Sequence, residues 1–136
     1  MQKNILITGC SSGLGLALTN YYLEKNYKVF GISRKKPDIT NTNFIHKSFD
    51  LSNISKIKEE LSAFILDIKE IDTVFLNAGM LGKIKILSEL SIQELNEVYA
   101  LNVYANKELL DILMKKKKKN ILVISSGASK NGYKGW

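Results

Sequence analysis

The 136-residue sequence predicts an α/β fold, in which a doubly wound parallel sheet is covered by helices on both faces. Two observations support this prediction. Short, nearly continuous apolar runs alternate along the chain with longer segments of helical spacing, and strands buried on both faces have such uninterrupted hydrophobicity. A glycine-rich turn also follows the first apolar run directly and opens a helical segment. Both features are typical of repeated strand–helix–strand units.

Five apolar runs are predicted to be strands, and the third is the weakest of them. They are residues 4–8, 27–32, 44–46, 73–76 and 121–124. With this order of elements the last strand would form an exposed apolar sheet edge, which natural proteins avoid because such an edge templates aggregation. We therefore expect the sheet to be incomplete at its C-terminal side.

Three segments are predicted to be helices. The third opens with Ser91-Ile92-Gln93-Glu94, which fits a capping box, and is expected to run to about Met114. The first two have apolar stripes at helical spacing. These stripes are Leu14, Leu18, Tyr21 and Tyr22, and then Ile54, Ile57, Leu61, Phe64 and Ile65.

Composition places the chain among ordinary soluble proteins of one domain, with 45% hydrophobic and 24% charged residues. We expect residues 1–136 to form a single dinucleotide-binding domain. No apolar run approaches the roughly 20 residues of a membrane-spanning helix. Met1 leads into a run too short for a signal peptide, and the single Cys10 cannot form an internal disulfide. We therefore expect a cytoplasmic protein with no membrane partner.

The formal charge of +7 raises the question of a nucleic-acid or acidic partner. Much of the excess lies in the run from Lys115 to Lys119, and such a run is usually the solvated end of a helix. The aromatic residues form no pattern of the kind that base stacking requires. A basic nucleic-acid binder is therefore the least favoured alternative.

The glycine turn is the main functional signal. It reads Thr8-Gly9-Cys10-Ser11-Ser12-Gly13-Leu14-Gly15 between a strand and a helix, where backbone N–H groups and the helix dipole attract a pyrophosphate. Gly9 would permit the tight turn, Gly13 the approach of the phosphates, and Gly15 close packing of helix and strand. The alternative is a flexible turn without a ligand, and the surrounding βαβ pattern favours the dinucleotide.

The end of the second strand favours NADP(H) over NAD(H). It reads Ile32-Ser33-Arg34-Lys35-Lys36, where NAD enzymes often carry a carboxylate for the ribose 2′-hydroxyl. The Arg34 guanidinium can bind a 2′-phosphate bidentately, and Ser33 could add a hydroxyl hydrogen bond. A lysine-rich chain also has basic loops of no special function, so NAD(H) stays an alternative.

The spacing Gly-x-x-x-Gly-x-Gly, with four later motifs in matching order, resembles the short-chain dehydrogenase/reductase family. The resemblance extends along the whole chain and implies an NAD(P)-binding Rossmann fold. It also implies an oxidoreductase that transfers hydride between the nicotinamide and a small carbonyl or alcohol. In the motif that closes the fourth strand, leucine replaces the first asparagine of the family's Asn-Asn-Ala-Gly. The later motifs are Asp50-Leu51, Leu76-Asn77-Ala78-Gly79, Asn102 and Ile124-Ser125-Ser126.

The resemblance assigns a role to each motif. Ser126 would orient the carbonyl or alcohol, and Asn102 would help to hold a proton-relaying water; these are the expected catalytic residues. Without the resemblance, both would be interpreted as polar residues satisfying local backbone. Asp50 would border the adenine pocket. The expected cofactor-binding residues are Thr8, Gly9, Ser11, Ser12, Gly13, Leu14, Gly15, Ser33, Arg34, Asp50, Leu51, Asn77, Ala78 and Gly79.

The family's Tyr-x-x-x-Lys motif is missing. It would lie about a dozen residues beyond Ser126, past Trp136, and Tyr133 is too close to the serine to replace it. We therefore expect a truncated chain that is inactive on its own, whether a fragment, a disrupted gene product or part of a longer enzyme. The alternative is a non-catalytic dinucleotide-binding module. The family commonly pairs through the helix 91–114, so a homo-oligomer is conceivable.

Three smaller signals stay secondary. Cys10, at a helix N-terminus, is either a reactive thiol or, preferably, one of the variable small residues of the turn. His46 has no ligand-spaced neighbours, so no metal site is assigned. Met80 and Leu81 are expected to line the cofactor cleft or the core.

Overall fold

A five-stranded parallel sheet forms the centre of the protein, in a computed structural model that describes residues 1–117 and 120–134. The strand order is β3-β2-β1-β4-β5, and every neighbouring pair is parallel. The predicted doubly wound α/β fold is confirmed. The strands are β1 (Asn4–Thr8), β2 (Lys28–Ser33), β3 (Phe44–Ser48), β4 (Thr73–Leu76) and β5 (Asn120–Val123).

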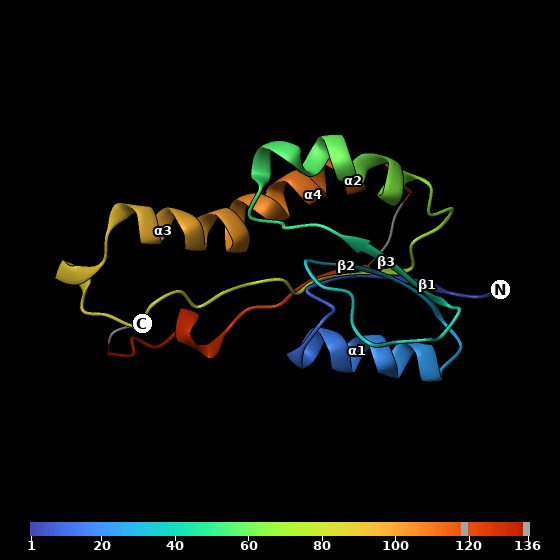
Figure 1. Cartoon of the computed structure of the whole chain (residues 1–136), viewed down its shortest axis with the longest axis horizontal. Coiled ribbons are helices and arrows are strands. Elements are labelled where there is room, and N and C mark those ends of the chain that lie inside the picture. The colour runs from blue at the N-terminus through green and yellow to red at the C-terminus, as the bar shows by residue number, and fades with distance from the viewer. Residues whose placement is uncertain (118–119, 135–136) are drawn as a thin grey trace.

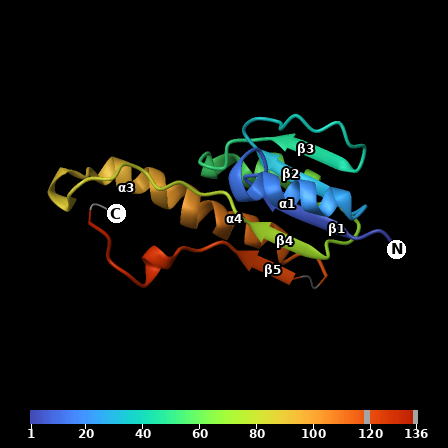
Figure 2. The same cartoon turned by 90° about the horizontal axis from the view of Figure 1, so that it is seen from below.

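Helices cover both faces of the sheet (Figure 1). Helix α1 (Gly13–Glu24) covers one face, while α2 (Ile57–Leu66) and α4 (Ala105–Leu113) lie together on the other. Helix α3 (Ile92–Tyr99) extends beyond the sheet, and Figure 2 shows the same projection from a second direction. Short 3₁₀ turns precede α2 and α3 and follow β5. They are η1 (Ile54–Lys56), η2 (Leu87–Glu89) and η4 (Gly127–Ser129).

Alternate side chains of the central strands enter two separate cores, because successive strand residues point to opposite faces. Toward α2 and α4, Leu6, Phe30 and Val74 join the buried residues of those helices. Toward α1, Ile5 and Val29 join a smaller cluster. Burial on both faces explains why β1, β2 and β4 read as nearly continuous apolar runs.

The strand predictions differ from the structure mainly at the edges of the sheet. The ranges of β1 and β4 are as predicted, and β2 and β5 are shifted by one residue. Strand β3 is longer than the predicted 44–46, since its pairing with β2 continues to Ser48 opposite Ser33. The added residues Lys47 and Ser48 are polar, because an edge strand is only partly covered, so hydrophobicity does not reveal them.

The predicted apolar stripe of α1 is wrong in part. Leu14 and Tyr21 are 52% and 51% exposed, and the residues that face the sheet are Gly15, Thr19 and Leu23. Gly15 must face the glycine turn because only glycine permits the close contact with Gly9 found there, and this fixes the rotation of the helix. The stripe of α2 is confirmed, with Ile57, Leu61 and Ile65 fully buried.

The long third helix is present but not uniform. Its capping box is confirmed: the Glu94 N–H donates to Ser91 Oγ at 3.1 Å, and the Ser91 N–H donates to the Glu94 carboxylate at 3.0 Å. Between α3 and α4 the helix widens into a π-helical turn, η3 (Ala100–Tyr104). The helix then ends at Leu113, one residue before the predicted Met114.

Strand β5 is an apolar edge strand, as predicted. It pairs with β4 on one side, and Leu122 and Val123 are 43% and 58% exposed. In the lysine run before it, Lys116 donates to the carbonyl oxygens of Leu66 and Ile68 at the end of α2. This contact agrees with a cation at a helix C-terminus. Lys118 and Lys119 of the run, and Trp136, lie outside the described residues.

Over the described ranges 1–117 and 120–134, the structure contains no helix that is both long and apolar enough to cross a membrane.

We expect Leu61→Ala to lower the free energy of unfolding by about 2–5 kcal/mol, since it opens a cavity between α2 and the sheet. Leu61 is fully buried, whereas Leu66 on the same helix is 39% exposed. Leu66→Ala is the matched control and should change stability by less than about 1 kcal/mol. Urea unfolding of both variants measures the difference. Equal losses would contradict the position of α2 on the sheet.

Candidate functional site

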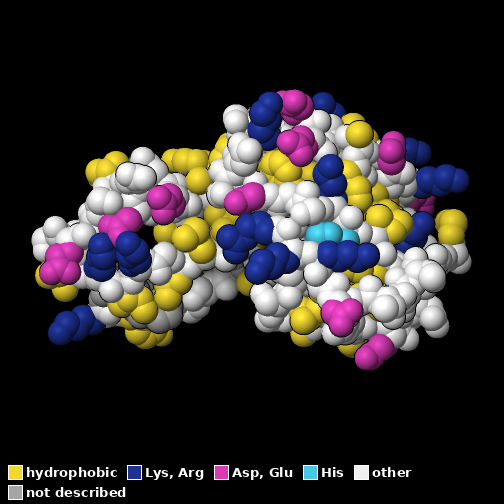
Figure 3. All heavy atoms as spheres, viewed as in Figure 1, with side chains coloured by type: hydrophobic (Ala, Val, Ile, Leu, Met, Phe, Trp, Pro, Cys, Tyr) yellow, Lys and Arg dark blue, Asp and Glu magenta, His cyan; other side chains and the backbone are white. Residues whose placement is uncertain are grey.

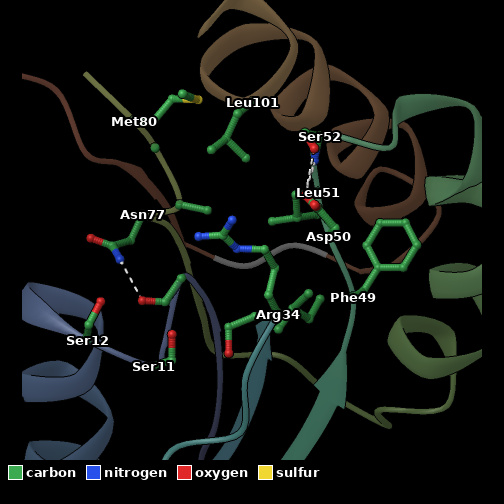
Figure 4. Close-up of a pocket in the computed structure, with 15 residues that line it drawn as sticks. Ser11, Ser12, Arg34, Phe49, Asp50, Leu51, Ser52, Asn77, Met80 and Leu101 are labelled. Atoms are coloured by element: carbon green, nitrogen blue, oxygen red, sulfur yellow. Dashed lines mark hydrogen bonds between the residues drawn. The ribbon is translucent and has the colours of Figure 1, made fainter. Parts of the chain in front are cut away.

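Many of the predicted site residues surround a cavity of about 400 Å³ at the carboxyl ends of β1, β2 and β4 (Figure 4). β1 lies between β2 and β4, and the chain covers opposite faces of the sheet on leaving β1 and β4. Open α/β sheets bind ligands at such a switch point, outside the carboxyl ends of the strands. The location therefore fits a nucleotide site.

Some predicted site residues lie around the cavity and others support it. The support residues Thr8 and Gly15 are buried beneath it, whereas Gly13 and Leu14 are exposed on α1. Asn102 and Ser126 are not among the lining residues. The predicted residues that line the cavity are Gly9, Ser11, Ser12, Ser33, Arg34, Asp50, Leu51, Asn77, Ala78, Gly79 and Met80.

The glycine turn has the geometry of a phosphate cradle. Gly9 has φ +69° and donates its N–H to the Ile32 carbonyl at 2.8 Å, which closes the turn against β2. A Cβ at Gly15 would lie 2.0 Å from the Gly9 oxygen, so no larger residue fits. A Cβ at Gly13 would meet nothing within 4 Å, and its φ of +51° lies in the left-handed region that favours glycine. Ser12 makes no side-chain capping bond to α1, which leaves the helix N-terminus available to an anion.

Thr8 and Asn77 fasten the end of β1 to the end of β4. Thr8 Oγ1 accepts hydrogen bonds from the backbone N–H groups of Asn77 and Ala78, both at 3.0 Å. In return Asn77 Nδ2 donates to the carbonyl oxygens of Thr8 at 3.1 Å and Gly9 at 3.3 Å. The Asn77 amide nitrogen thus holds the glycine turn in place, while the residue itself lines the cavity.

Arg34 and Asp50 bring opposite charges to one side of the cavity. The Arg34 side chain extends from the end of β2 into the space between Asn77 and Leu51 (Figure 4). Hydrogen bonds from the Ser52 hydroxyl (2.7 Å) and N–H (2.9 Å) lower the pKa of Asp50, and the charge of Arg34 adds to this effect. Asp50 is therefore a carboxylate near neutral pH, and Arg34 is the basic group available to a phosphate.

The Ser33 hydroxyl is directed into its own turn. Ser33 is 6% exposed, and its Oγ lies 2.8 Å from the Lys35 carbonyl oxygen, to which it donates its single proton. Ser33 therefore lines the cavity, and its hydroxyl proton is used in the hydrogen bond to the Lys35 carbonyl. The predicted hydrogen bond from this hydroxyl to a cofactor phosphate is not tested by these contacts and stays a prediction.

Asn102 anchors the segment that follows β4. Its Oδ1 accepts from the Met80 N–H and its Nδ2 donates to the Met80 carbonyl, each at 2.8 Å. The residue belongs to the π-helical turn η3, and such turns occur frequently at functional sites. The oxygen and the nitrogen of the Asn102 amide are therefore both hydrogen-bonded to the backbone of Met80. The predicted role in holding a catalytic water stays a prediction, and the observed role is to position Met80 at the cavity.

Ser126 follows β5 on the same edge of the sheet as the cavity. It is exposed, its hydroxyl accepts from the Ala128 N–H at 3.2 Å, and its carbonyl accepts from the Ser129 hydroxyl at 2.7 Å. Since β5 pairs with β4, Ser126 lies on the side of the cavity bounded by Asn77 and Gly79. The hydroxyl still carries a proton that it can donate outward.

Sequence reasoning missed four residues that line the cavity, namely Ile32, Phe49, Ser52 and Leu101. Ser52 could have been found, because a serine two residues after an aspartate commonly hydrogen-bonds to its carboxylate. Phe49 and Leu101 carry no local signal, since they reach the site through β3 and the π-helical turn. Leu81, expected with Met80, is 50% exposed and does not line this cavity.

Cys10 and His46 have no reactive or metal-binding geometry. Cys10 is fully buried, and this burial raises the pKa of its thiol, so the alternative of a reactive thiolate is wrong. Within residues 1–117 and 120–134, no three His, Cys, Asp or Glu side chains form a group that could hold a metal ion.

The sequence of this chain matches a known protein family and several of its members. The family described as short chain dehydrogenase matches residues 3–136. The chain is 35% identical over 140 residues to a benzil reductase ((S)-benzoin forming) of Bacillus subtilis (strain 168), covering 96% of this chain and 58% of the relative. It is 28% identical to the NADPH-dependent pterin aldehyde reductase of Arabidopsis thaliana, covering 96% and 59%. The chain thus spans less than two thirds of the length of these curated relatives.

A solved structure shows the same fold. The crystal structure of a short-chain dehydrogenase/reductase from Burkholderia vietnamiensis superposes with a TM-score of 0.86 at 26% identity, over 99% of this chain and 68% of that one. The strand order and the glycine turn of this structure are consistent with the family that the sequence matches. The chain belongs to the short-chain dehydrogenase/reductase family.

Proposed function

We propose that this protein binds NADP(H) in the cavity and transfers hydride between the nicotinamide and a small carbonyl or alcohol substrate. The observation that carries the proposal is the Arg34 side chain in the cavity beside the glycine turn, at a strand end that has no carboxylate. Benzil reductase and the NADPH-dependent pterin aldehyde reductase, by their names, are carbonyl reductases, which supports this reaction class. Residues 1–136 would be the dinucleotide-binding part.

The residues present fit this cofactor along its length. The pyrophosphate would lie over the turn from Gly9 to Gly15 at the N-terminus of α1, and the 2′-phosphate on Arg34. The adenine would lie against Asp50 and Leu51. The ribose and nicotinamide would pass Asn77, Ala78 and Gly79 toward Ser126. Backbone N–H groups supply the anion contacts, because the side chains of Thr8 and Asn77 are used to hold the turn.

The chain's own residues would position the substrate. When bound, the reduced cofactor supplies the hydride for a carbonyl carbon. The Ser126 hydroxyl would donate a hydrogen bond to the carbonyl oxygen. Asn102 fixes Met80, and a water near this turn would relay protons. The family resemblance implies that a tyrosine activated by a lysine delivers the proton, and we propose catalysis for a chain that includes that pair.

We expect the protein to bind NADPH more tightly than NADH, and Arg34→Ala to weaken NADPH binding by about 10- to 100-fold. The reason is the loss of charge-assisted hydrogen bonds to the 2′-phosphate. Affinity for NADH, which has no such phosphate, should change little. Cofactor fluorescence titration measures both constants.

Lys36→Ala is the matched control for that experiment. It removes a neighbouring positive charge that does not line the cavity, so its NADPH affinity should stay within about threefold of the original at physiological salt. Equal effects of both substitutions would mean that the basic turn acts only through its net charge. A preference for NADH would contradict the assignment of Arg34.

We expect Ser126→Ala to lower kcat for carbonyl reduction by about 100-fold in the complete enzyme, because a donor to the developing oxyanion is lost. Benzil with NADPH is the first assay, followed by small aromatic aldehydes. NADPH affinity should not change. Ser125→Ala is the control and should retain activity. An equal loss in both variants would contradict the choice of Ser126, and no turnover with any carbonyl would favour a non-catalytic dinucleotide-binding module.

A further inference from the structure

Three side chains from different elements meet beneath the basic turn that follows β2. Ser33 Oγ, at the end of β2, lies 2.9 Å from His46 Nε2 on β3 and 3.2 Å from Cys10 Sγ in the glycine turn. It also lies 2.8 Å from the Lys35 carbonyl oxygen. None of the functions assigned above uses His46. The hydroxyl thus joins the glycine turn, β3 and the turn that carries Arg34.

The protons of this group can be assigned by counting donors and acceptors. The Lys35 carbonyl can only accept, so the single Ser33 hydroxyl proton points to it. Both lone pairs of Ser33 Oγ are then open, and all contacts are satisfied when His46 Nε2–H and the Cys10 thiol donate. Burial raises the pKa of Cys10, while burial and the nearby Lys36 lower the pKa of His46. The Cys10 thiol and the His46 imidazole are therefore both neutral near pH 7. Cys10 must be a neutral thiol in order to donate to Ser33 Oγ.

Three consecutive carbonyl oxygens of the turn, those of residues 33–35, each accept a hydrogen bond. The Phe49 N–H donates to the Ser33 oxygen at 3.1 Å, and Ser48 Oγ donates to the Arg34 oxygen at 2.7 Å. The Ser33 hydroxyl holds the third carbonyl, that of Lys35. Two of these bonds come directly from β3 and its end. The third comes from the Ser33 hydroxyl, which also contacts His46.

The charges around His46 favour a role in which it orients Ser33 and does not itself bind a phosphate. Figure 3 shows the single histidine side chain (cyan) among several Lys and Arg side chains (dark blue) on one face of the molecule. These Lys and Arg side chains already supply positive charge that attracts a phosphate, so His46 does not have to be charged. A neutral imidazole that orients Ser33 contributes without adding repulsion to this basic face.

We propose that His46 is a positioning residue for cofactor selectivity. Through Ser33 it fixes the 33–35 turn in the conformation that presents Arg34 to the cavity, and it thereby determines the preference for a 2′-phosphate. This inference rests on the proposed binding of NADP(H).

The test compares His46→Phe with His46→Gln. Phenylalanine keeps a ring beside Phe44, whose centroid lies 6.0 Å from the His46 ring, but has no donor for Ser33. Glutamine restores an N–H donor at similar reach. We expect His46→Phe to raise the Kd for NADPH about five- to tenfold, with the Kd for NADH within about twofold. His46→Gln should recover most of the NADPH affinity.

Asn4→Ala is the matched control. It removes a side-chain hydrogen bond, from Asn4 Nδ2 to the Glu70 carbonyl, at the amino end of β1 and far from the cavity. It should leave the ratio of NADPH to NADH affinity unchanged even if it lowers thermal stability. If His46→Phe does not fold, His46→Leu removes the same contact to Ser33 with a smaller side chain and should shift the ratio in the same direction.

The possible outcomes separate this inference from the proposed function. A protein that binds neither cofactor would overturn both. A protein that prefers NADPH, and keeps that preference in His46→Phe, would overturn only the role of His46. A parallel loss of both cofactors would show that the histidine acts only on stability, and failure of His46→Gln to restore the ratio would show that its hydrogen bond to Ser33 does not set the preference; either result would overturn the proposal.

Discussion

The close approach of the glycine turn to the first turn of α1 fixes the positions of the other site residues. A side chain at Gly15 would collide with the Gly9 carbonyl oxygen, so helix and strand can meet at this distance only because position 15 has no Cβ. The Asn77 amide nitrogen lies 3.3 Å from that same oxygen. The end of β4 is thereby tied to the turn through Asn77 and Thr8. The cavity begins where these three segments meet, and its shape depends on that contact.

Much of the fold could be predicted from the sequence, and the failures have physical causes. Strands β1 and β4 were predicted to the residue because burial on both faces makes them continuously apolar. The edge strand β3 was predicted too short, since its exposed end is polar. The buried face of α1 could not be found from its apolar residues, because contact at Gly15, not hydrophobicity, sets the rotation of this helix. The π-helical turn around Asn102 has no local sequence signal.

The site was predictable at the level of which residues lie near it, and less so at the level of what their side chains do. The glycine turn, Arg34 and Asp50 were identified because local motifs carry them. Ser33 Oγ contacts His46, 13 residues away, and the Asn102 side chain bonds to Met80, 22 residues away. Such partners are set by strand pairing and by packing of the long helix, which no local pattern records. A polar residue in a motif can therefore be located before its hydrogen bonds can be assigned.

A division of roles follows from these hydrogen bonds. Thr8, Ser33, Asn77 and Asn102 all bond to main-chain groups, so they shape the backbone around the cavity. If the protein binds a dinucleotide as proposed, the pyrophosphate would contact mainly backbone N–H groups at the start of α1, which any sequence with the same glycines would provide. In the same proposal, discrimination between NADP(H) and NAD(H) would depend on the Arg34 guanidinium, and the turn that carries it is held by hydrogen bonds to three carbonyl oxygens. On this proposal, general affinity and selectivity would reside in separate parts of the structure, and a change confined to the turn or its β3 support would alter selectivity while the sheet and the glycine turn stay intact.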